Sequence, residues 1–512
     1  MPGLKRAVLA ALLLVAGWAR AAGSPPAPPA PTTPVAWSAA ARADIDYAFS
    51  TLLENHPGVF DRSNPGFTAR LRAARAAGHV LAAKARSAAG YAAAISRFNT
   101  VIGDGHAGAV ATLNESLAPA ARWPGFLAVW RGDGLFVYAT EPGGPAAGSR
   151  VLGCDGKSVR RLLLTNVFRF IGRSAEPGNW WTRSVNLFVD DGNPFVRPPR
   201  RCRFQTPGGM ETRVLAWTAV NADYQAWRQN AYNGDSHPVG ETEPARGLVW
   251  IAMPTFEPDA AQRDAYRAMI SAISDDRGKV LNARAVVIDL RANQGGSSDW
   301  SLDLAGALWG RGRVDRAMGA YNRGVQIWWR ASRDNADYAA HLVDILKAEK
   351  QIRMAEEFAP VALGLATAHT RGQPYFVEPP DPPAAPLGRD EPPPLTTPVY
   401  VIVPGQCASA CLDALDTFTR FPNTRLIGAP SSADSAYLEV RPQPAPSGLS
   451  VVIIPNKMWV RRPRPAGGAY RPGIEVTTLK WSTADFQAVI EADLERGGKA
   501  NRQPVRPGLA GG

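Results

Sequence analysis

AVVIDLRANQGG, residues 285–296, is the stretch that decides the fold. Its first half is a continuous apolar run rich in β-branched residues, which is typical of a strand buried on both faces of a sheet. Gly295 and Gly296 follow, and glycine allows positive φ angles and a close approach of the backbone to a ligand. Because open α/β sheets hold ligands at the carboxyl ends of their strands, the stretch predicts a site at this loop.

An alternation of strand and helix surrounds this stretch. The apolar runs and amphipathic segments follow one another in the rhythm of a parallel or mixed sheet covered by helices, which predicts an α/β core over residues 240–480. In this sheet we expect further strands at 247–256, 398–403, 424–430 and 448–460, with helices at 259–276, 299–310 and 407–421.

The rest of the chain divides into parts of different character. Helical periodicity predicts a helical region at 37–117, whereas two strand-like runs around a Gly-Asp-Gly turn predict a hairpin within a separate domain at 118–216. The core is interrupted at 331–398 by a charged helical segment and a proline-rich loop, and it is followed by a helix and tail at 481–512.

The N-terminus has the pattern of a secretory signal peptide. Residues 1–21 combine a basic start, an apolar run and a small-x-small cleavage pattern, and the Pro/Ala-rich residues 22–36 predict an extended linker. No later stretch reaches the roughly 18 apolar residues of a membrane span. We therefore expect a periplasmic or secreted protein without a transmembrane segment.

Composition excludes several function classes. The net charge of the 512-residue chain is +12, but its arginines are scattered, which indicates a solvated basic surface and not a nucleic-acid binder. Neither an HExxH nor a CxxC motif occurs, so no metal site is predicted. Neither a phosphate-binding loop nor a dinucleotide fingerprint occurs either, and no cofactor is expected.

Four cysteines in an exported chain permit two disulfides. We favour Cys154 with Cys202 and Cys407 with Cys411, because each pair is local in sequence. For the second pair, two packed free thiols are an equal alternative, since residues four apart on a helix can be bridged only with suitable side-chain directions.

Ser409 lies midway between Cys407 and Cys411, in GQCASACLD at 405–413. An apolar strand leads into it and a helix follows, so its hydroxyl would be exposed beside unpaired helix N–H groups that can stabilise an oxyanion. Ala410 and its small neighbours permit a tight turn. The plain alternative is a helix N-cap, for which serine is a favoured residue type.

Four separated pieces then resemble one family. FNTVIGDGHAGAV (98–110), a PDZ-like segment at 141–163, AVVIDLRANQGG and VYVIVPGQCASACLDAL (399–415) follow in this order. They resemble the tail-specific (C-terminal-processing) serine proteases and the related tricorn protease core. The resemblance implies a crotonase-like αβ core with a PDZ-like insert that binds peptides.

The resemblance also implies roles for the glycine loop. Gly295, Gly296 and the Ala410 N–H would form the oxyanion hole, while Asp289 and Arg291 would hold the loop in place. Ser409 would be the nucleophile.

The general base is expected to be His106. Simple tail-specific proteases use a lysine after the next strand, but residues 428–437 contain none, and Lys457 is only a minor candidate. The tricorn branch instead implies a histidine before the PDZ-like insert, where His106 lies between glycines. His56 is interpreted as a residue at a helix end or turn.

A third group should orient the histidine ring. The tricorn-like glutamate is missing, since no glutamate comes just before Pro472. Asp434 is our first choice and Glu439 the second, whereas Asp104 is too close in sequence to reach the ring and would order the loop.

These expectations combine into an exported serine peptidase that forms an acyl-enzyme on Ser409. Its substrates would be polypeptides, in unstructured or C-terminal segments. Two alternatives stay open: a non-catalytic peptide- or ligand-binding protein on the same fold, and a small-ester serine hydrolase.

Overall fold

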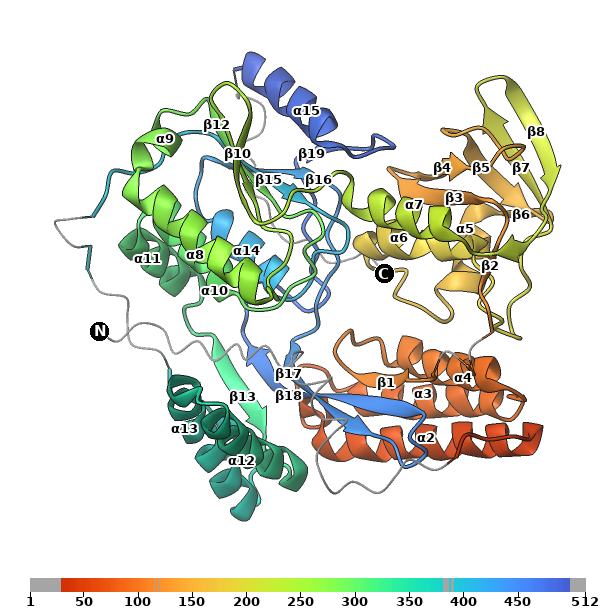
Figure 1. Cartoon of the computed structure of the whole chain (residues 1–512). Coiled ribbons are helices and arrows are strands. Elements are labelled where there is room, and N and C mark those ends of the chain that lie inside the picture. Colours follow the sequence, from red (N-terminus) through yellow and green to blue (C-terminus); the bar gives the residue numbers. More distant parts are fainter. Residues whose placement is uncertain (1–28, 115, 118, 381–385, 388–390, 498–512) are drawn as a thin grey trace.

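The computed structural model describes residues 29–114, 116–117, 119–380, 386–387 and 391–497. The expected signal peptide, residues 22–28 of the expected linker and the tail beyond residue 497 lie outside the described residues, and the last three residues of that linker already belong to a helix that begins at Pro34. Figure 1 shows a mixed α/β fold in which a helical N-terminal part, a separate β-rich lobe and a sheet-and-helix core lie around a common centre.

The core is built on a six-stranded sheet whose central strands are buried along their whole length. All neighbouring strands are parallel except the first pair, in which β10 is antiparallel to β11. The strand order is β10 (Gly240–Ala245), β11 (Leu248–Ala252), β12 (Ala285–Asp289), β15 (Val399–Val403), β16 (Thr424–Gly428) and β19 (Ile474–Glu475).

Helices cover both faces of this sheet, because apolar side chains project from each face of its buried strands. One face carries α8 (Ala260–Asp275), α9 (Arg277–Leu281), α10 (Asp299–Trp309), α11 (Arg311–Tyr321) and α14 (Ala410–Phe418). The other face packs against α15 (Thr483–Glu495) and Trp181.

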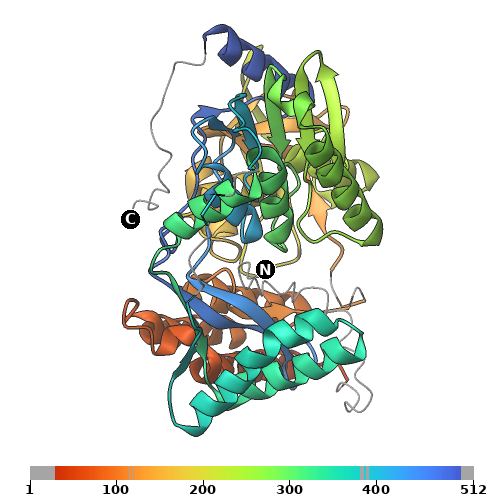
Figure 2. The ribbon, with the colours of Figure 1, turned by 90° about the vertical axis from the view of Figure 1, so that its left-hand side faces the viewer.

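The N-terminal helices lie on a second sheet. Figure 2 shows this helical layer below the core. Its helices are α2 (Pro34–Asn55), α3 (Phe67–Ala82) and α4 (Ala88–Ile102). The sheet under them consists of β1 (Gly108–Ala111), β18 (Ser450–Val460), β13 (Gln326–Arg330) and β14 (Tyr375–Val377), with β17 (Tyr437–Pro444) paired to β18.

Strand β18 corrects one expectation. The apolar run at 448–460 does form a strand, but its place in the core sheet was wrong, because it pairs antiparallel with β1, β13 and β17. The helical region also ends earlier than expected, since α4 stops at Ile102 and β1 follows. Sequence periodicity identifies a strand but not its partner, which explains the first error.

The β-rich lobe contains the expected hairpin, β3 (Phe126–Arg131) and β4 (Gly134–Thr140), which is confirmed. The sheet continues through β5 (Arg150–Cys154), β7 (Arg201–Thr206) and β8 (Gly209–Val214), with the short β6 (Lys157–Ser158) beside β5. A disulfide joins Cys154 to Cys202 across paired positions of β5 and β7. The helices of the lobe are α5 (Val159–Leu162), α6 (Pro177–Arg183) and α7 (Ala222–Asn233).

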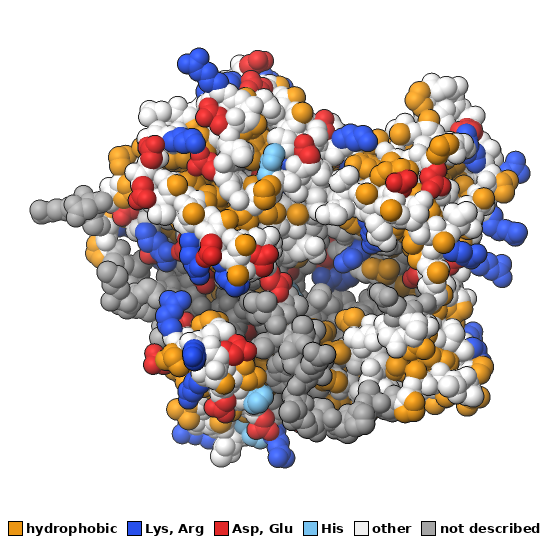
Figure 3. All heavy atoms as spheres, in the orientation of Figure 1, with side chains coloured by type: hydrophobic (Ala, Val, Ile, Leu, Met, Phe, Trp, Pro, Cys, Tyr) orange, Lys and Arg blue, Asp and Glu red, His pale blue; other side chains and the backbone are white. Residues whose placement is uncertain are grey.

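The helical part of the insertion forms an antiparallel pair, α12 (Arg333–Ala348) and α13 (Ile352–Thr370), between β13 and β14. It has an apolar core of its own that includes Leu342, Phe358 and Leu365. Within the described ranges, no helix is long and apolar enough to cross a bilayer. Figure 3 shows basic and acidic side chains interspersed on the visible face, without one continuous basic patch.

Helix α6 of the β-rich lobe packs directly on the core. The Gly178 N–H donates to the Ser431 carbonyl at 3.1 Å, and a Cβ at Gly178 would collide with the backbone of Gly405 and Ser432. These contacts place α6 against the loops that lead to Ser409 and Asp434.

We predict that Gly178→Ala destabilises this junction. The three nearest atoms that a Cβ would meet all belong to backbone, so α6 must shift, and overpacking of this kind costs about 1–3 kcal/mol of unfolding free energy. Urea unfolding measures the loss. Gly208→Ala is the control within the same lobe, because the nearest atom to its Cβ is Thr206 Oγ1 at 3.8 Å. Equal stability of the two variants would contradict the tight junction.

Candidate active site

One pocket brings together most of the residues expected to act. Ser409, His106, Gly295, Gly296 and Ala410 all line a cavity of about 480 Å³. They come from the loops before β1, after β12 and before α14, which are far apart in the chain. Asp434, Glu439 and Lys457 also line this cavity.

The backbone of Ser409 has an unusual conformation. Its φ of 55° and ψ of −129° lie outside the regions that serine ordinarily adopts, at the junction of β15 and α14. The side chain makes no capping hydrogen bond to the helix, so the hydroxyl does not serve as an N-cap. Strained residues of this kind cluster at functional sites, where the surroundings hold them in place.

A disulfide brackets Ser409. Cys407 and Cys411 are joined to each other, and both side chains are buried. The two halves of the turn are therefore tied together across the serine, and neither sulfur is a free thiol in this structure.

Gly295 lies directly against the serine. A Cβ at this position would be 2.8 Å from the Ser409 Cβ and 2.8 Å from the Ala408 carbonyl oxygen, and its φ is 120°, so a side chain does not fit. Its N–H, however, donates to Asn293 Oδ1 at 2.9 Å. This bond corrects the expectation that Gly295 offers an oxyanion donor, and it leaves the N–H groups of Gly296 and Ala410.

A buried ion pair supports the same loop, in agreement with the role expected for Asp289 and Arg291. Arg291 Nη2 is 2.6 Å from Asp289 Oδ2, and the Arg291 N–H donates to Asp289 Oδ1 at 2.9 Å. Burial opposes the charge of Arg291, but Asp289 and Asp235 outweigh it and raise the pKa of the guanidinium. The ion pair between Arg291 and Asp289 thus holds the loop after β12 in place.

The loop that carries His106 is held by Asp104. The His106 N–H donates to Asp104 Oδ1 at 2.9 Å, and His56 Nε2 lies 3.2 Å from Asp104 Oδ2. His56 Nδ1 accepts the Gly58 N–H at 2.9 Å, so Nε2 carries the proton of the neutral ring. Burial disfavours the Asp104 charge, but the hydrogen bond and charge of His56, together with the charge and backbone N–H of His106, outweigh it and lower the pKa of Asp104 to about 2.

No described residue orients the ring of His106. Its Nδ1 is buried and has no hydrogen-bond partner in the described part of the chain. The oxygens of Asp434 are engaged elsewhere: Oδ1 accepts the Ser409 N–H at 3.0 Å and Oδ2 is 3.5 Å from Arg464 Nη1. The contact between Asp434 and His106 expected from the sequence is therefore absent from this structure.

Glu439 and Lys457 form a second buried pair in the pocket wall. Their charged groups are 3.2 Å apart, and Lys457 Nζ also lies 4.9 Å from the centre of the Trp329 ring. Burial raises the pKa of Glu439, while the neighbouring ammonium opposes that change. Lys457, the minor candidate for the base, and Glu439, the second choice for the orienting group, thus pair with each other.

Sequence reasoning missed part of the pocket wall. Leu438 and Val440 from β17, and Trp459 from β18, line the cavity. The prolines within β17 conceal its strand pattern, and only its alternation of residue types could have indicated it.

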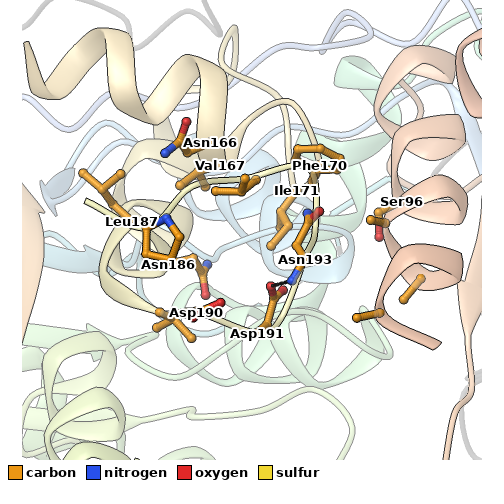
Figure 4. Close-up of a pocket in the computed structure, with 16 residues that line it drawn as sticks. Ser96, Asn166, Val167, Phe170, Ile171, Asn186, Leu187, Asp190, Asp191 and Asn193 are labelled. Atoms are coloured by element: carbon orange, nitrogen blue, oxygen red, sulfur yellow. Dashed lines mark hydrogen bonds between the residues drawn. The ribbon is translucent and has the colours of Figure 1, made fainter. Parts of the chain in front are cut away.

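A smaller cavity of about 130 Å³ lies between α4 and the β-rich lobe. Figure 4 shows Ser96 on one side and Asn166, Asn186 and Asn193 on the other. None of the expected site residues lines it. Among the residues that the structure describes, no group of three or more His, Cys, Asp and Glu side chains could hold a metal ion.

The comparison with protein families decides the class. Residues 248–492 match peptidase family S41. These residues are a peptidase S41 domain. The chain is accordingly a serine-type peptidase, and the matched segment contains Gly295, Gly296, Ser409 and Asp434.

Solved structures show a shared fold over most of the chain. Mature CPAF complexed with lactacystin is 14% identical and has a TM-score of 0.61, covering 90% of this chain and 98% of that chain. Mature CPAF alone is 13% identical and has a TM-score of 0.59, covering 90% of this chain and 99% of that chain. The tricorn protease matches at 10% identity with a TM-score of 0.35, over 90% of this chain and 37% of that chain. No curated protein matches the sequence.

We predict that His56 makes the protein less stable at acidic pH. Burial lowers the pKa of His56 below its ordinary 6.5, so between these values the unfolded chain binds a proton that the folded chain does not. The contribution of neutral His56 to the free energy of unfolding is therefore fully present above about pH 6.5. It falls as the pH drops, by at most about 1.4 kcal/mol per pH unit for one proton.

Urea unfolding of the wild type and His56→Gln at pH 7.5 and 5.0 tests this. The variant should lose less stability between the two pH values, even if it starts from a lower one. His369→Gln, at an exposed histidine in the last turn of α13, is the control and should keep the wild-type difference. An unchanged difference in His56→Gln would count against the assignment.

Proposed function

We propose that this protein is an exported serine peptidase that cleaves polypeptides through an acyl-enzyme on Ser409, with His106 as general base. The observation that carries the proposal is the shared cavity, in which a half-buried, strained serine, a histidine and the glycine loop after β12 meet. Membership of the serine-type S41 family agrees with this assignment.

The chemistry follows from the residues of the cavity. His106 takes the hydroxyl proton as Ser409 attacks the carbonyl carbon, and it returns the proton to the leaving amine. Water then hydrolyses the ester with the same histidine as base. Because the serine carries the acyl group, no cofactor is needed.

Two backbone N–H groups are the proposed oxyanion donors. Ala410 begins α14, where helix N–H groups lack partners within the helix and the helix dipole favours negative charge. Gly296 has a φ of 130° and lies beside Phe256, which pairs with it as an isolated bridge. The N–H groups of Gly295 and Ser409 are already donated to side chains.

A histidine base relates this site more closely to the tricorn type than to the Ser-Lys type. Residues 428–437 contain no lysine, and the ammonium of Lys457 pairs with Glu439. We further assign the 240–480 core to the crotonase-like class, with a PDZ-like insert at 118–216. The insert would dock unstructured or C-terminal peptides by adding them to a sheet edge.

Export to the periplasm or the medium belongs to the same proposal. The signal-peptide pattern of residues 1–21 supports it. The two disulfides, which persist in oxidising compartments, support it independently.

Two alternatives differ in their chemistry. The unpartnered Nδ1 of His106 favours a non-catalytic binding protein, since a base without an orienting group is poorly prepared for proton transfer. A small-ester hydrolase would use the same serine but would not cleave peptides.

We predict covalent labelling of Ser409 by a fluorophosphonate probe. Mass spectrometry should find the adduct on the peptide that contains this serine in the wild type and no adduct in Ser409→Ala. His106→Ala should label about 10²–10⁴-fold more slowly, because the general base is lost. A folded wild type without adduct would sink the hydrolase assignment. Ester turnover without cleavage in a peptide library would favour the ester hydrolase.

A further inference from the structure

The N–H group of the proposed nucleophile donates to a buried carboxylate. Ser409 N is 3.0 Å from Asp434 Oδ1, and Asp434 is 3% exposed. We propose that Asp434 is a positioning residue that fixes the backbone of Ser409, and that it does not orient His106. The inference rests on the proposed function, because it concerns the same serine.

The conformation of Ser409 requires such a restraint. A non-glycine residue at a φ of 55° relaxes unless its neighbours prevent it. The disulfide closes the turn and Gly295 packs against the Ser409 side chain, but neither makes a hydrogen bond to the Ser409 N–H. The bond to Asp434 acts on the peptide unit of Ser409 itself. It is charge-assisted, which makes it stronger than a bond to a neutral acceptor.

Arg464 anchors the carboxylate and the helix together. Its Nη1 is 3.5 Å from Asp434 Oδ2, its Nη2 is 2.8 Å from Asp413 Oδ1, and its Nε is 3.1 Å from Asp416 Oδ2. Asp413 belongs to the first turn of α14. One buried guanidinium therefore connects the group that holds Ser409 with the helix that follows it.

The rest of this charged cluster lies on the side of Asp413 and Asp416. Arg462 contacts both carboxylates, and the hydroxyls of Tyr321 and Tyr470 donate to Asp416 Oδ1 at 2.9 and 2.7 Å. Removal of the Tyr321 hydroxyl thus weakens the cluster without touching Ser409 or Asp434.

The base is held in the same way. The His106 N–H donates to the buried Asp104 at 2.9 Å, as the Ser409 N–H donates to Asp434. In both cases a carboxylate fixes the backbone and leaves the side chain directed to the pocket. Because Asp434 accepts the Ser409 N–H, its side chain lies in the wall of the same cavity.

The two roles of Asp434 differ in their pH dependence. A carboxylate that orients and charges an imidazole raises the pKa of that base, so its neutralisation moves the midpoint of the pH–rate profile downward. A carboxylate that fixes a backbone changes the rate and leaves the midpoint in place. Asp434→Asn keeps an acceptor oxygen for the Ser409 N–H, whereas Asp434→Ala removes it.

The experiment measures the rate of fluorophosphonate labelling from pH 5 to 9 in the full chain. Asp434→Ala should label about 10²-fold more slowly, the loss that a displacement of about 1 Å causes. Asp434→Asn should recover to within about tenfold of the wild type, and all midpoints should coincide. Tyr321→Phe, the matched control, should label at the wild-type rate.

Hydrogen exchange at the Ser409 amide gives a second readout that does not depend on activity. The amide should be protected in the wild type and Asp434→Asn, and it should exchange about 10-fold faster or more in Asp434→Ala. Unchanged protection in Asp434→Ala overturns the proposal, whether or not the serine reacts.

The remaining outcomes are equally decisive. A lowered midpoint in Asp434→Asn assigns the residue to His106, and an equal loss in Tyr321→Phe reduces it to general support of the fold; each overturns the proposal. Absence of labelling in the wild type refutes the proposed function instead, and the exchange data then decide alone whether Asp434 holds the serine.

Discussion

The positive φ angle of Ser409 is the constraint on which the surrounding structure depends. A serine reaches this conformation only where its neighbours leave no alternative. The disulfide between Cys407 and Cys411 closes the turn, and Asp434 accepts the hydrogen bond from the Ser409 N–H. Because Gly295 has no side chain, its loop can approach the serine closely. Arg464 is a buried charge that needs compensation. Asp416 and the other carboxylates around it provide that compensation.

The site joins two separate layers of the molecule. Ser409 and the glycine loop end strands of the core sheet, whereas His106 comes from the loop before β1, in the sheet under the N-terminal helices. Strand β18 runs between these regions and contributes Lys457 and Trp459 to the wall of the cavity. The relative position of the layers therefore decides whether serine and histidine share one pocket.

The sequence predicted what depends on local pattern. The buried strand at Ala285–Asp289, the hairpin from Phe126 to Thr140 and the strand-to-helix turn at Ser409 were recognisable because their periodicity and turn residues are contained in short segments. The family order of the motifs placed His106 beside Ser409 in expectation, and both line one cavity.

What the sequence could not supply were long-range partners. Nothing in the run 448–460 distinguishes membership of one sheet from the other. The preference for Asp434 as partner of His106 followed from its place in the Ser/Gly-rich loop where the family places active-site groups, and this place does not reveal that its carboxylate accepts the Ser409 N–H. Likewise, only the structure reveals that Asn293 occupies the Gly295 N–H. Partner choice among polar groups is a property of three-dimensional packing.

The pairing of β1 with β18 has a consequence for folding of the chain during its synthesis. Gly108 pairs with Ile453, so the loop of His106 acquires its position only when a strand close to the other end of the chain is present. Contacts of such high sequence separation form late, after the entropy of closing the intervening chain has been overcome. Ser409 and His106 are therefore brought into one cavity only after β18 has been synthesised and has paired with β1.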